Sequence, residues 1–568
     1  MNSATWGKLY YGVALLVSAV ALPLALYLVM GFDVRDPRWW SWLWRYYRSQ
    51  DELPPRLVWT GLAWLLGTTL IIGLCPFSLA PSHYGRARWA KGWLKLWWMG
   101  LTAKHGIVLG RIGGRLLISS KILSVLILAP SRTGKTRGTI IPTVLAYRGS
   151  VIVHDPKGEV FDVSAGHRAK LGRVLRLEWS SPARSVCWNP LSSGNLPGER
   201  GGRGNAVDRL CSVAIPGDPK SFWISSPRLA LAAITLYLVY EAERQGGPEA
   251  TFSGVLSWLG KAMSDAANAD AEDPVAMQLE RAAGVAEIEG YPERISTGLR
   301  LVAQMNYKTR ADVLGTINSA LGIFLNESVA AVTARSDFTL KELRGTGGKP
   351  ASLYIVVPQN DMSAFAPVTG MLIEMASMEL LSKRPAKGES SVLFVLDEAR
   401  FLPPLDAISD GPSIGAGYLV HYLICAQDYG QLRMVYGRDK TDNIITNTAY
   451  KLVLAQNHIE TAEFVSRTIG NHTRRRKTSG RQFSLTTPSN IRSSTSEQYE
   501  AAPLVPAQDI LSLPFGRQIV MVQNRLHTPV MARSAFYDKV ARFRRRSRIK
   551  APALQSVYTP RTSRRHFR

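Results

Sequence analysis

The sequence predicts an α/β fold built on a parallel sheet with helices on both faces, preceded by two membrane-spanning segments. Three observations carry this prediction: apolar strand-like runs that alternate with helical stretches, a small-residue loop directly after one such run, and two long uncharged segments near the N-terminus. Strands of a parallel sheet are apolar along their whole length because both faces are buried. Ligands of such sheets bind where the strands end.

Eight short runs of aliphatic and β-branched residues are the predicted strands. They lie at residues 125–128, 150–153, 173–177, 353–357, 392–396, 419–424, 451–455 and 518–522. An Ala- and Leu-rich stretch from about 221 to 343 has helical periodicity, which predicts an all-α domain inserted into the α/β core. Residues 471–500 are rich in Ser and Thr and contain four consecutive basic residues, so they are predicted as a mobile loop.

The loop after the first predicted strand is typical of a nucleotide phosphate site. Residues 123–136 read LSVLILAPSRTGKT, and loops ending Gly-Lys-Thr bind phosphate through backbone N–H groups and a helix start. Lys135 is predicted to reach the β- and γ-phosphates and Thr136 to ligate Mg²⁺, although an ordinary strand-to-helix turn is the alternative. Ala129 replaces the first glycine of the motif and must therefore keep a negative φ. The residues predicted to surround the nucleotide are Ala129, Pro130, Ser131, Arg132, Thr133, Gly134, Lys135 and Thr136.

Two further predicted strands end in polar residues that complete such a site. VLFVL at 392–396 is followed by Asp397, predicted to hold Mg²⁺, and Glu398, predicted to orient and activate the attacking water. Acids at an ordinary helix start are the alternative, which the coincidence with the loop disfavours. Gln427 is predicted to hydrogen-bond the γ-phosphate or the water, the alternative being a polar strand end. Lys135, Glu398 and Gln427 are thus the predicted catalytic residues of an ATPase that uses Mg²⁺.

Two uncharged segments near the N-terminus predict a membrane hairpin. Residues 9–32 and 57–82 contain 24 and 26 consecutive uncharged residues, each enough to cross the ~30 Å hydrocarbon layer. Eleven of the 15 Trp lie in the first hundred residues, clustered beside these segments as interfacial aromatic belts are. A cleaved signal peptide is the alternative for the first segment, whose apolar run is longer than an ordinary signal core. Basic residues are balanced across the hairpin, so the need for cytoplasmic NTP places both termini inside.

Charge and cysteine content restrict the partners and the compartment. The formal net charge is +26, and residues 541–568 hold ten Lys or Arg with no Asp or Glu, which favours nucleic acid or anionic lipid as partner of this basic tail. The sequence leaves open which of the two the tail binds. The four cysteines are widely spaced without a C-x-x-C pair, which disfavours a disulfide framework or a zinc site and fits a reducing compartment.

Several stretches together carry a family resemblance. HYGRARWA follows the second apolar segment, HDPKGEVFD follows the phosphate loop, VLFVLDEARFLP contains the two acids, ICAQDYGQL contains Gln427, and APLVPAQDILSLP precedes the basic tail. In this order they resemble the coupling proteins of type IV secretion and conjugation, the TraG/TraD-like family of membrane-anchored ATPases. The family's nucleotide-loop, Walker B and third-motif positions correspond to Ala129 with Gly134–Thr136, to Asp397 with Glu398, and to Gln427.

The resemblance implies a RecA-like P-loop NTPase core with an inserted all-α domain and an N-terminal two-helix transmembrane hairpin. It implies a multi-pass inner-membrane protein that assembles towards a homo-hexamer with its ATPase domain in the cytoplasm. Its partners would be type IV secretion channel components and, as cargo, relaxase-bound single-stranded DNA or effector proteins. The predicted divisions are a hairpin with a short periplasmic loop, two parts of the nucleotide-binding domain around the all-α insertion, and a flexible basic tail, at 1–82, 83–220, 221–343, 344–540 and 541–568.

Two other functions remain open from the sequence. One is a membrane-anchored DNA pump of the chromosome-segregation type, although such chains usually carry more spans and a winged-helix reader. The other is a nucleotide-binding docking platform that hydrolyses poorly, which the alanines at 129 and 416 leave possible. Family members often have an arginine finger in the turn that here reads Gly415-Ala416-Gly417, so any finger must come from elsewhere, with Arg400, Arg433 and Arg467 as candidates.

Overall fold

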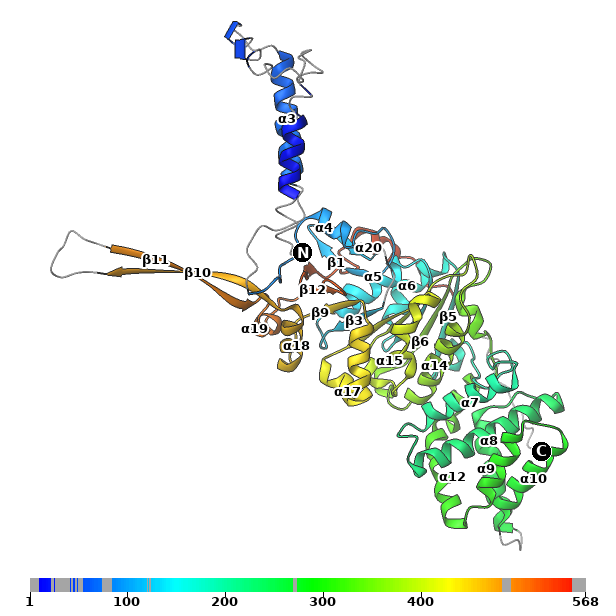
Figure 1. Cartoon of the computed structure of the whole chain (residues 1–568). Coiled ribbons are helices and arrows are strands. Elements are labelled where there is room, and N and C mark those ends of the chain that lie inside the picture. The colour runs from blue at the N-terminus through cyan, green and yellow to red at the C-terminus, as the bar shows by residue number, and fades with distance from the viewer. Residues whose placement is uncertain are drawn as a thin grey trace. The chain divides into compact units, whose positions relative to one another are not determined.

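The computed structural model describes residues 10–21, 25, 41, 44–45, 48–49, 55–73, 84–119, 121, 124–268, 273–482 and 492–553. It divides into two compact units (Figure 1). The small unit comprises Met1–Arg88 and Gly470–Leu504, and the large unit comprises Trp89–Ile469 and Val505–Arg568. Part of the predicted first span, most of the Trp-rich connection and residues 554–568 of the basic tail lie outside the described residues.

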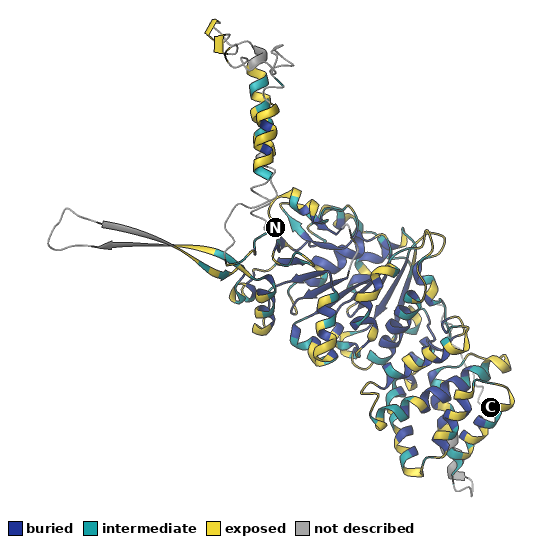
Figure 2. Cartoon of the chain, in the orientation of Figure 1, coloured by how far each residue is buried: buried dark blue, intermediate teal, exposed yellow. Residues whose placement is uncertain are grey.

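The large unit is built on an 11-stranded sheet with the order β2-β1-β13-β12-β9-β3-β8-β7-β4-β6-β5. Seven neighbouring strands, from β9 to β5, are parallel, and their burial (Figure 2) explains why they are apolar throughout. Their bounds are β3 Val125–Leu128, β4 Ser150–Asp155, β5 Arg173–Glu178, β6 Ala351–Val356, β7 Val392–Leu396, β8 Val420–Ala426 and β9 Tyr450–Val453. All seven coincide with predicted strands.

The other edge of the sheet is antiparallel, which corrects one prediction. The run at 518–522 forms β12 (Arg517–Val522), but it pairs with β9 in the antiparallel direction, Ile519 opposite Val453. β13 (Val530–Arg533) returns beside it, and β1 (Val108–Ile112) and β2 (Arg115–Ile118) extend the sheet. Because β12 runs against its neighbour, its beginning lies at the edge where β9 and β3 end.

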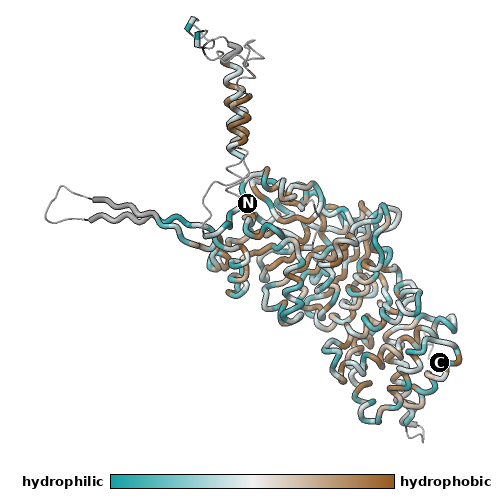
Figure 3. Tube along the Cα trace, in the orientation of Figure 1, coloured by the Kyte–Doolittle hydropathy of each residue, from teal (hydrophilic) through white to brown (hydrophobic). Residues whose placement is uncertain are grey.

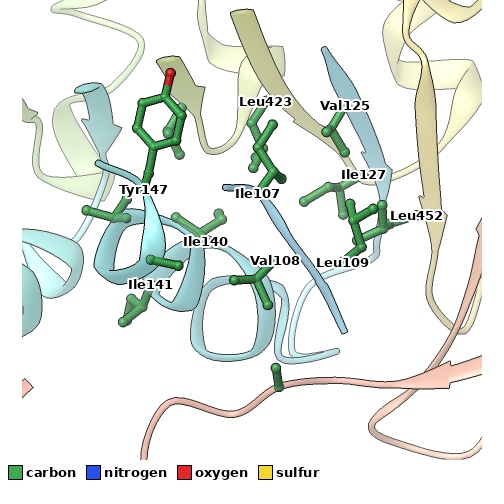
Figure 4. Close-up of a cluster of buried hydrophobic side chains, with 14 of the residues drawn as sticks. Ile107, Val108, Leu109, Val125, Ile127, Ile140, Ile141, Tyr147, Leu423 and Leu452 are labelled. Atoms are coloured by element: carbon green, nitrogen blue, oxygen red, sulfur yellow. The ribbon is translucent and has the colours of Figure 1, made fainter. Parts of the chain in front are cut away.

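Helices cover the sheet, and one cluster of buried hydrophobic side chains contains residues of its central strands. Ile107, Val125 and Ile127 meet Leu423 and Leu452 from neighbouring strands in this core (Figure 4). The helices of the α/β part are α4 Trp93–Trp98, α5 Ile141–Ala146, α6 Glu159–Ala169, α14 Ala366–Ser382, α15 Asp406–Ser409, α16 Gly411–Ile414, α17 Tyr429–Asn447, α18 Ile459–Ile469, α19 Ala507–Leu511 and α20 Ala541–Ser547. Burial of this apolar surface is the main stabilising contribution to the unit.

The predicted all-α insertion is present between β5 and β6. Its helices are α7 Arg200–Ala214, α8 Phe222–Gln245, α9 Phe252–Asn268, α10 Pro274–Ile288, α11 Glu293–Ala303, α12 Tyr307–Leu321 and α13 Glu327–Val332. The helical region begins with α7, about twenty residues before the predicted start at 221. The sequence of α7, RGGRGNAVDRLCSVA, contains three glycines, which lower helix propensity and resemble a loop.

The basic tail begins as part of the folded core. Residues 541–547 form α20, whose Phe543 is fully buried, and Arg546 donates a hydrogen bond to the carbonyl of Leu145 in α5. Arg542 donates to the carbonyl of Lys104 over 2.9 Å. The described part of the predicted flexible tail, 541–553, is therefore an ordered component of the large unit.

In the small unit, two apolar helices lie side by side and antiparallel. A helix at Tyr10–Ala21 pairs with α3 (Pro55–Gly73), which is hydrophobic along its length (Figure 3). The Tyr10 hydroxyl donates to the Ile71 carbonyl over 2.6 Å, and the Trp64 indole donates to the Ser18 carbonyl over 2.9 Å. Among the described residues, α8 alone is long and apolar enough to cross a membrane, and 56% of its apolar stretch is buried inside the protein. The two-span hairpin therefore stays a prediction.

The remainder of the small unit is a β-ribbon where the sequence predicted a mobile loop. β10 (Asn471–Gln482) and β11 (Arg492–Pro503) pair antiparallel over twelve residues, with Arg474 opposite Glu500. The Ala87 N–H donates to the Asn471 carbonyl over 3.0 Å at the base of the ribbon. The prediction was wrong because two polar strands that pair with each other have no apolar face to mark them.

Candidate nucleotide site

The predicted functional residues gather where three adjacent parallel strands end. β8 lies between β3 and β7 in the sheet. The phosphate loop follows β3, Gln427 follows β8, and the two acids follow β7. Parallel strands end at the same edge of a sheet, so these segments converge although they are separated by up to about 300 residues in the chain.

The loop has the backbone of a phosphate site. Gly134 has φ +83° and Arg132 has φ +65°, a left-handed conformation that is uncommon outside glycine. Ala129 is not among the described residues with positive φ, as its methyl group requires, and its N–H donates to Ala426 in β8 over 2.9 Å. The Thr133 hydroxyl donates to the Pro130 carbonyl over 2.7 Å and closes the turn. A helical segment begins at Thr136, so the loop leads directly into a helix N-terminus.

Lys135 links the loop to both acids. Its ammonium donates to Glu398 Oε1 over 2.7 Å and lies 3.2 Å from Asp397 Oδ1. The Thr136 hydroxyl donates to Asp397 Oδ2 over 2.9 Å. Lys135 and Asp397 are only 6% and 5% exposed, so this contact is largely shielded from water and its electrostatic interactions are strengthened. The structure thus brings together the predicted lysine, threonine and paired carboxylates.

Gln427 joins the same network. Its amide Nε2 lies 3.3 Å from Glu398 Oε2 and 3.2 Å from Ser131 Oγ, and its Oε1 accepts from Gln431 over 3.0 Å. Glu398 has φ +60°, an uncommon conformation for a residue with a side chain, and such conformations cluster at functional sites. All the predicted catalytic residues therefore lie within one chain of contacts.

An open cavity of about 490 Å³ adjoins these contacts. Its lining includes loop residues, the acids, and side chains that follow β4 and β6. They are Ser131, Arg132, Gly134, Lys135, Thr136, Arg137, Asp155, Pro156, Lys157, Glu159, Gln359, Met362, Asp397 and Glu398. The cavity has several cationic groups beside carboxylates, a chemistry that fits a polyphosphate with a divalent cation.

The pKa values of the site follow from burial and ion pairing. Burial disfavours the charge of Lys135, but Asp397 and Glu398 outweigh it and raise the pKa of the ammonium. Burial likewise opposes the charge of Glu398, but Lys135 lowers the pKa of that carboxyl overall. Both groups are therefore charged near neutral pH. Burial, with a smaller contribution from the negative charge of Asp397, raises the pKa of Asp155 to about 7.

The oxygen donors fit a hard divalent cation. Asp397 Oδ1 is buried and accepts no hydrogen bond among the described residues, facing only the Lys135 ammonium. Asp397 and the adjacent Thr136 hydroxyl are the kind of ligands Mg²⁺ takes, since it is usually held by one or two carboxylates together with substrate phosphates. Within the described residues no group of three His, Cys, Asp or Glu could hold a metal ion.

Several contacts at this site were missed by sequence reasoning. The His154 ring nitrogen Nδ1 lies 2.8 Å from the Asp397 backbone carbonyl, and Asp155 accepts from the Phe161 N–H over 2.8 Å at the start of α6. His154 and Asp155 both belong to HDPKGEVFD, one of the stretches that carry the family resemblance, and they end β4, which lies next to β7. Phe515 and Phe536 also lie beside Gly134, and only the antiparallel return of β12 brings them there.

The three candidate arginine fingers have contacts within their own chain. Arg400 Nε lies 3.6 Å from Glu398 Oε2, Arg433 lies over the Tyr429 ring at 4.5 Å, and Arg467 lies 3.9 Å from Glu463. Arg467 has the most exposed side chain of the residues in these ion pairs, at 79%. The identity of a finger stays a prediction.

Comparison with known proteins assigns the family. The sequence matches the family described as "Type IV secretory system Conjugative DNA transfer" over residues 106–562. It is 28% identical over 481 residues to conjugal transfer protein TraG of Escherichia coli, covering 76% of this chain and 73% of TraG. It is 27% identical over 508 residues to VirD4 of Agrobacterium fabrum (strain C58), covering 84% of this chain and 70% of VirD4.

Solved structures support the same assignment at the level of the fold. The plasmid coupling protein TrwB in complex with ADP and Mg²⁺ superimposes with a TM-score of 0.57 at 17% identity, covering 80% of this chain and 96% of that structure. The unbound TrwB structure gives 0.56 at 17% identity, covering 80% and 94%. The large unit thus has the fold of these structures, a RecA-like α/β core with a helical insertion. Since the family match spans most of the sequence, this chain belongs to the type IV secretory system conjugative DNA transfer family.

Proposed function

We propose that the protein is an ATP-hydrolysing coupling protein that delivers substrates to a type IV secretion channel. The observation that carries the proposal is the convergence of Lys135, Thr136, Asp397 and Glu398 around one cavity. The relatives support it, because TraG is named a conjugal transfer protein and TrwB a coupling protein solved with ADP and Mg²⁺ and with ATP and GTP analogues.

Nucleotide binding exchanges the partners of Lys135. In this structure its ammonium is held by two carboxylates. The β- and γ-phosphates of ATP are stronger multivalent anions, and the loop N–H groups and the helix N-terminus bind them together with the ammonium. Mg²⁺ bound at Thr136 and Asp397 would supply neutralisation of charge on the phosphate oxygens.

Glu398 is the proposed general base. While it pairs with Lys135 its pKa is lowered, so the carboxylate is ionised and weakly basic. Once the lysine turns to the phosphates, burial again favours the protonated carboxyl, which strengthens it as a base for the attacking water. The Gln427 amide, already 3.3 Å from Glu398, orients that water or donates to the transferring phosphoryl group.

Membrane anchoring is the second part of the proposal. The antiparallel contacts between the helix at 10–21 and α3 support a two-span hairpin in the inner membrane, with both termini and the ATPase in the cytoplasm. The short helix α4 supports a nearby membrane, since Trp97 and Trp98 are 64% and 65% exposed. Arg525 lies 3.9 Å from the centre of the Trp98 ring. Exposed Trp beside basic groups is typical of membrane interfaces.

The remaining expectations are proposals on the same basis. The protein would assemble as a homo-hexamer and receive relaxase-bound single-stranded DNA or effector proteins. The proposed domain divisions differ from the predicted ones in three places. The helical insertion begins at α7, residues 541–553 belong to the folded core, and residues 470–504 belong to the small unit instead of the nucleotide-binding domain.

The test is ATP binding and turnover by the full chain in lipid nanodiscs, with Lys135→Ala compared against Lys157→Ala. Both lysines line the cavity, but Lys157 is exposed and lies outside the loop. We expect Lys135→Ala to abolish turnover and weaken ATP binding at least tenfold, while Lys157→Ala stays within about threefold of the unmodified protein, because a surface charge contributes little. Equal turnover by the two variants would contradict the proposed site.

A further inference from the structure

A pair of phenylalanines lies on the opposite side of the phosphate loop from the acids. Phe515 immediately precedes Gly516 and β12, and Phe536 follows β13. Because β12 is antiparallel to β9 and β13 to β12, the start of the one and the end of the other lie at the edge where β3 ends. Along this edge the order is Phe536 and Phe515, then the phosphate loop, then Gln427, then Asp397 with Glu398.

The phenylalanines contact the loop itself. A β-carbon placed on Gly134 would lie 3.0 Å from Phe536 Cε1 and 3.4 Å from Phe515 Cζ. The segment around Phe536 is tied to the turn after the loop, since the Ala535 N–H donates to the Gly138 carbonyl over 3.1 Å and the Tyr537 N–H to the Arg137 carbonyl over 3.2 Å. Arg137 in turn donates through Nε to Asp538 over 2.8 Å.

One of the two rings is exposed. Phe515 is 68% exposed, whereas Phe536 is only 7% exposed. The rings stack with centroids 5.5 Å apart and an interplanar angle of 14°, and the Arg137 guanidinium lies 5.4 Å from the Phe536 ring centre. Phe536 is thus fixed on several sides and supports Phe515, whose outer surface is open to solvent.

The direction in which the triphosphate runs determines which part of the nucleotide faces the Phe515 ring. The γ-phosphate belongs beside Glu398 and Gln427, where the water is activated. The α-phosphate and the nucleoside must therefore extend past Thr136 in the other direction, towards Arg137 and the segments that precede β12 and follow β13. An open aromatic ring at that position meets the nucleobase, because bases stack on aromatic side chains.

We propose that Phe515, supported by Phe536, is the stacking platform for the base of the bound nucleotide. This rests on the proposed function, since it names the binding partner of the base in the same site. Stacking depends on the π-face that every base has, so the platform secures affinity without selecting adenine over guanine.

The experiment compares two ligands that share their phosphates. Binding of Mg-ATP and of Mg-tripolyphosphate to the full chain in nanodiscs is measured by calorimetry for the unmodified protein, Phe515→Ala and Phe515→Trp. We expect Phe515→Ala to weaken ATP about 5- to 150-fold, the range for loss of one base–aromatic stack, and to leave tripolyphosphate unchanged. Phe515→Trp keeps a ring and should retain ATP affinity. Tyr307→Ala removes another exposed aromatic ring, 74% exposed in α12, and is the matched control.

Each alternative result would overturn either the stacking platform or the proposed function. Unchanged ATP affinity in Phe515→Ala would overturn the platform. An equal loss of ATP and tripolyphosphate would also overturn it, since Phe515 would then act by shaping the loop. If the unmodified protein bound neither ligand, the proposed function itself would fail, which is a different outcome from a selective failure of the base contact.

Discussion

The two sides of the phosphate loop differ in chemistry, with charged groups on one side and aromatic rings on the other. Towards β7 the loop meets charged and nearly buried groups, with Lys135 held by two carboxylates. Towards β12 it meets uncharged rings, one of them open to solvent. Electrostatic interactions are strong where water is excluded, whereas stacking tolerates exposure. The acid side is therefore suited to lowering the barrier of the reaction and the aromatic side to holding the nucleotide, so substitutions on the two sides should separate turnover from affinity.

The largest of these effects is expected on ATP turnover when Glu398, the proposed general base, is neutralised. Glu398→Gln should lower the rate of ATP hydrolysis about 10²- to 10⁴-fold, the usual contribution of a general base, while ATP affinity stays within about threefold. Glu159→Gln, a second acid that lines the cavity, is the control and should stay near the unmodified rate. A steady-state phosphate-release assay with equilibrium nucleotide binding checks both. A rate within tenfold of the unmodified protein would remove Glu398 from this role.

The pH dependence of folding stability tests the acid side through Asp155. Its folded-state pKa of about 7 lies above the ordinary value of 3.8 for an aspartate, so its contribution to stability is fully present below about pH 4 and is lost as pH rises to 7. Three pKa units set an upper bound of roughly 4 kcal/mol. Asp155→Asn keeps the hydrogen-bond acceptor but cannot ionise. As pH rises from 5 to 8, the thermal unfolding midpoint of this variant should therefore increase relative to that of the unmodified protein. If the unfolding midpoints of the two nucleotide-free proteins changed equally with pH, this expectation would be contradicted.

Gln427 should have a smaller effect on the rate. Replacing it by Ala removes one hydrogen-bond donor to a charged group, a contribution of about 1.5–3 kcal/mol, which corresponds to roughly 10- to 150-fold in turnover. Gln359→Ala is the matched control, because that residue lines the same cavity but follows β6, which is two strands from β7. Single-turnover hydrolysis separates the two. If the variants were equally active, the amide would be only a polar strand end.

The smallest expected effect is the coupling free energy between the acid side and the aromatic side of the phosphate loop. Phe515→Ala combined with Gln427→Ala should give free-energy changes in kcat/KM that add to within about 0.5 kcal/mol, because the contacts of the two side chains within the described part of the chain share no residue. A larger coupling, measured from the four rates of the cycle, would show that the loop transmits strain from one side to the other.

The acid side was predictable from the sequence and the aromatic side was not, for a physical reason. VLIL and VLFVL are apolar because they are buried, and the residues that follow them, Lys135, Asp397 and Glu398, have side chains suited to phosphate and Mg²⁺. QIVMV was also recognised as a strand, but a run of apolar residues has the same pattern in either direction. Only the antiparallel pairing of β12 with β9 brings Phe515 to the loop.

Other elements were missed where local composition conflicts with the final structure. Three glycines concealed α7, and the all-polar ribbon of β10 and β11 has no hydrophobic alternation. The basic tail resembled a solvated segment because five of the seven residues of α20 are polar, although one buried side chain, Phe543, fixes it to the core. In each case the tertiary contact outweighed the local propensity.

The central position of β3 also has a consequence for synthesis. Val125 pairs with Leu423 on one side and with Tyr450 on the other, so this strand has no neighbours until about 300 further residues have left the ribosome. At about 5–20 residues per second this interval is on the order of 15–60 s. Nascent chains therefore pass through a long period in which no nucleotide can be bound, and stalled chains that end before β8 should be sensitive to protease with or without ATP.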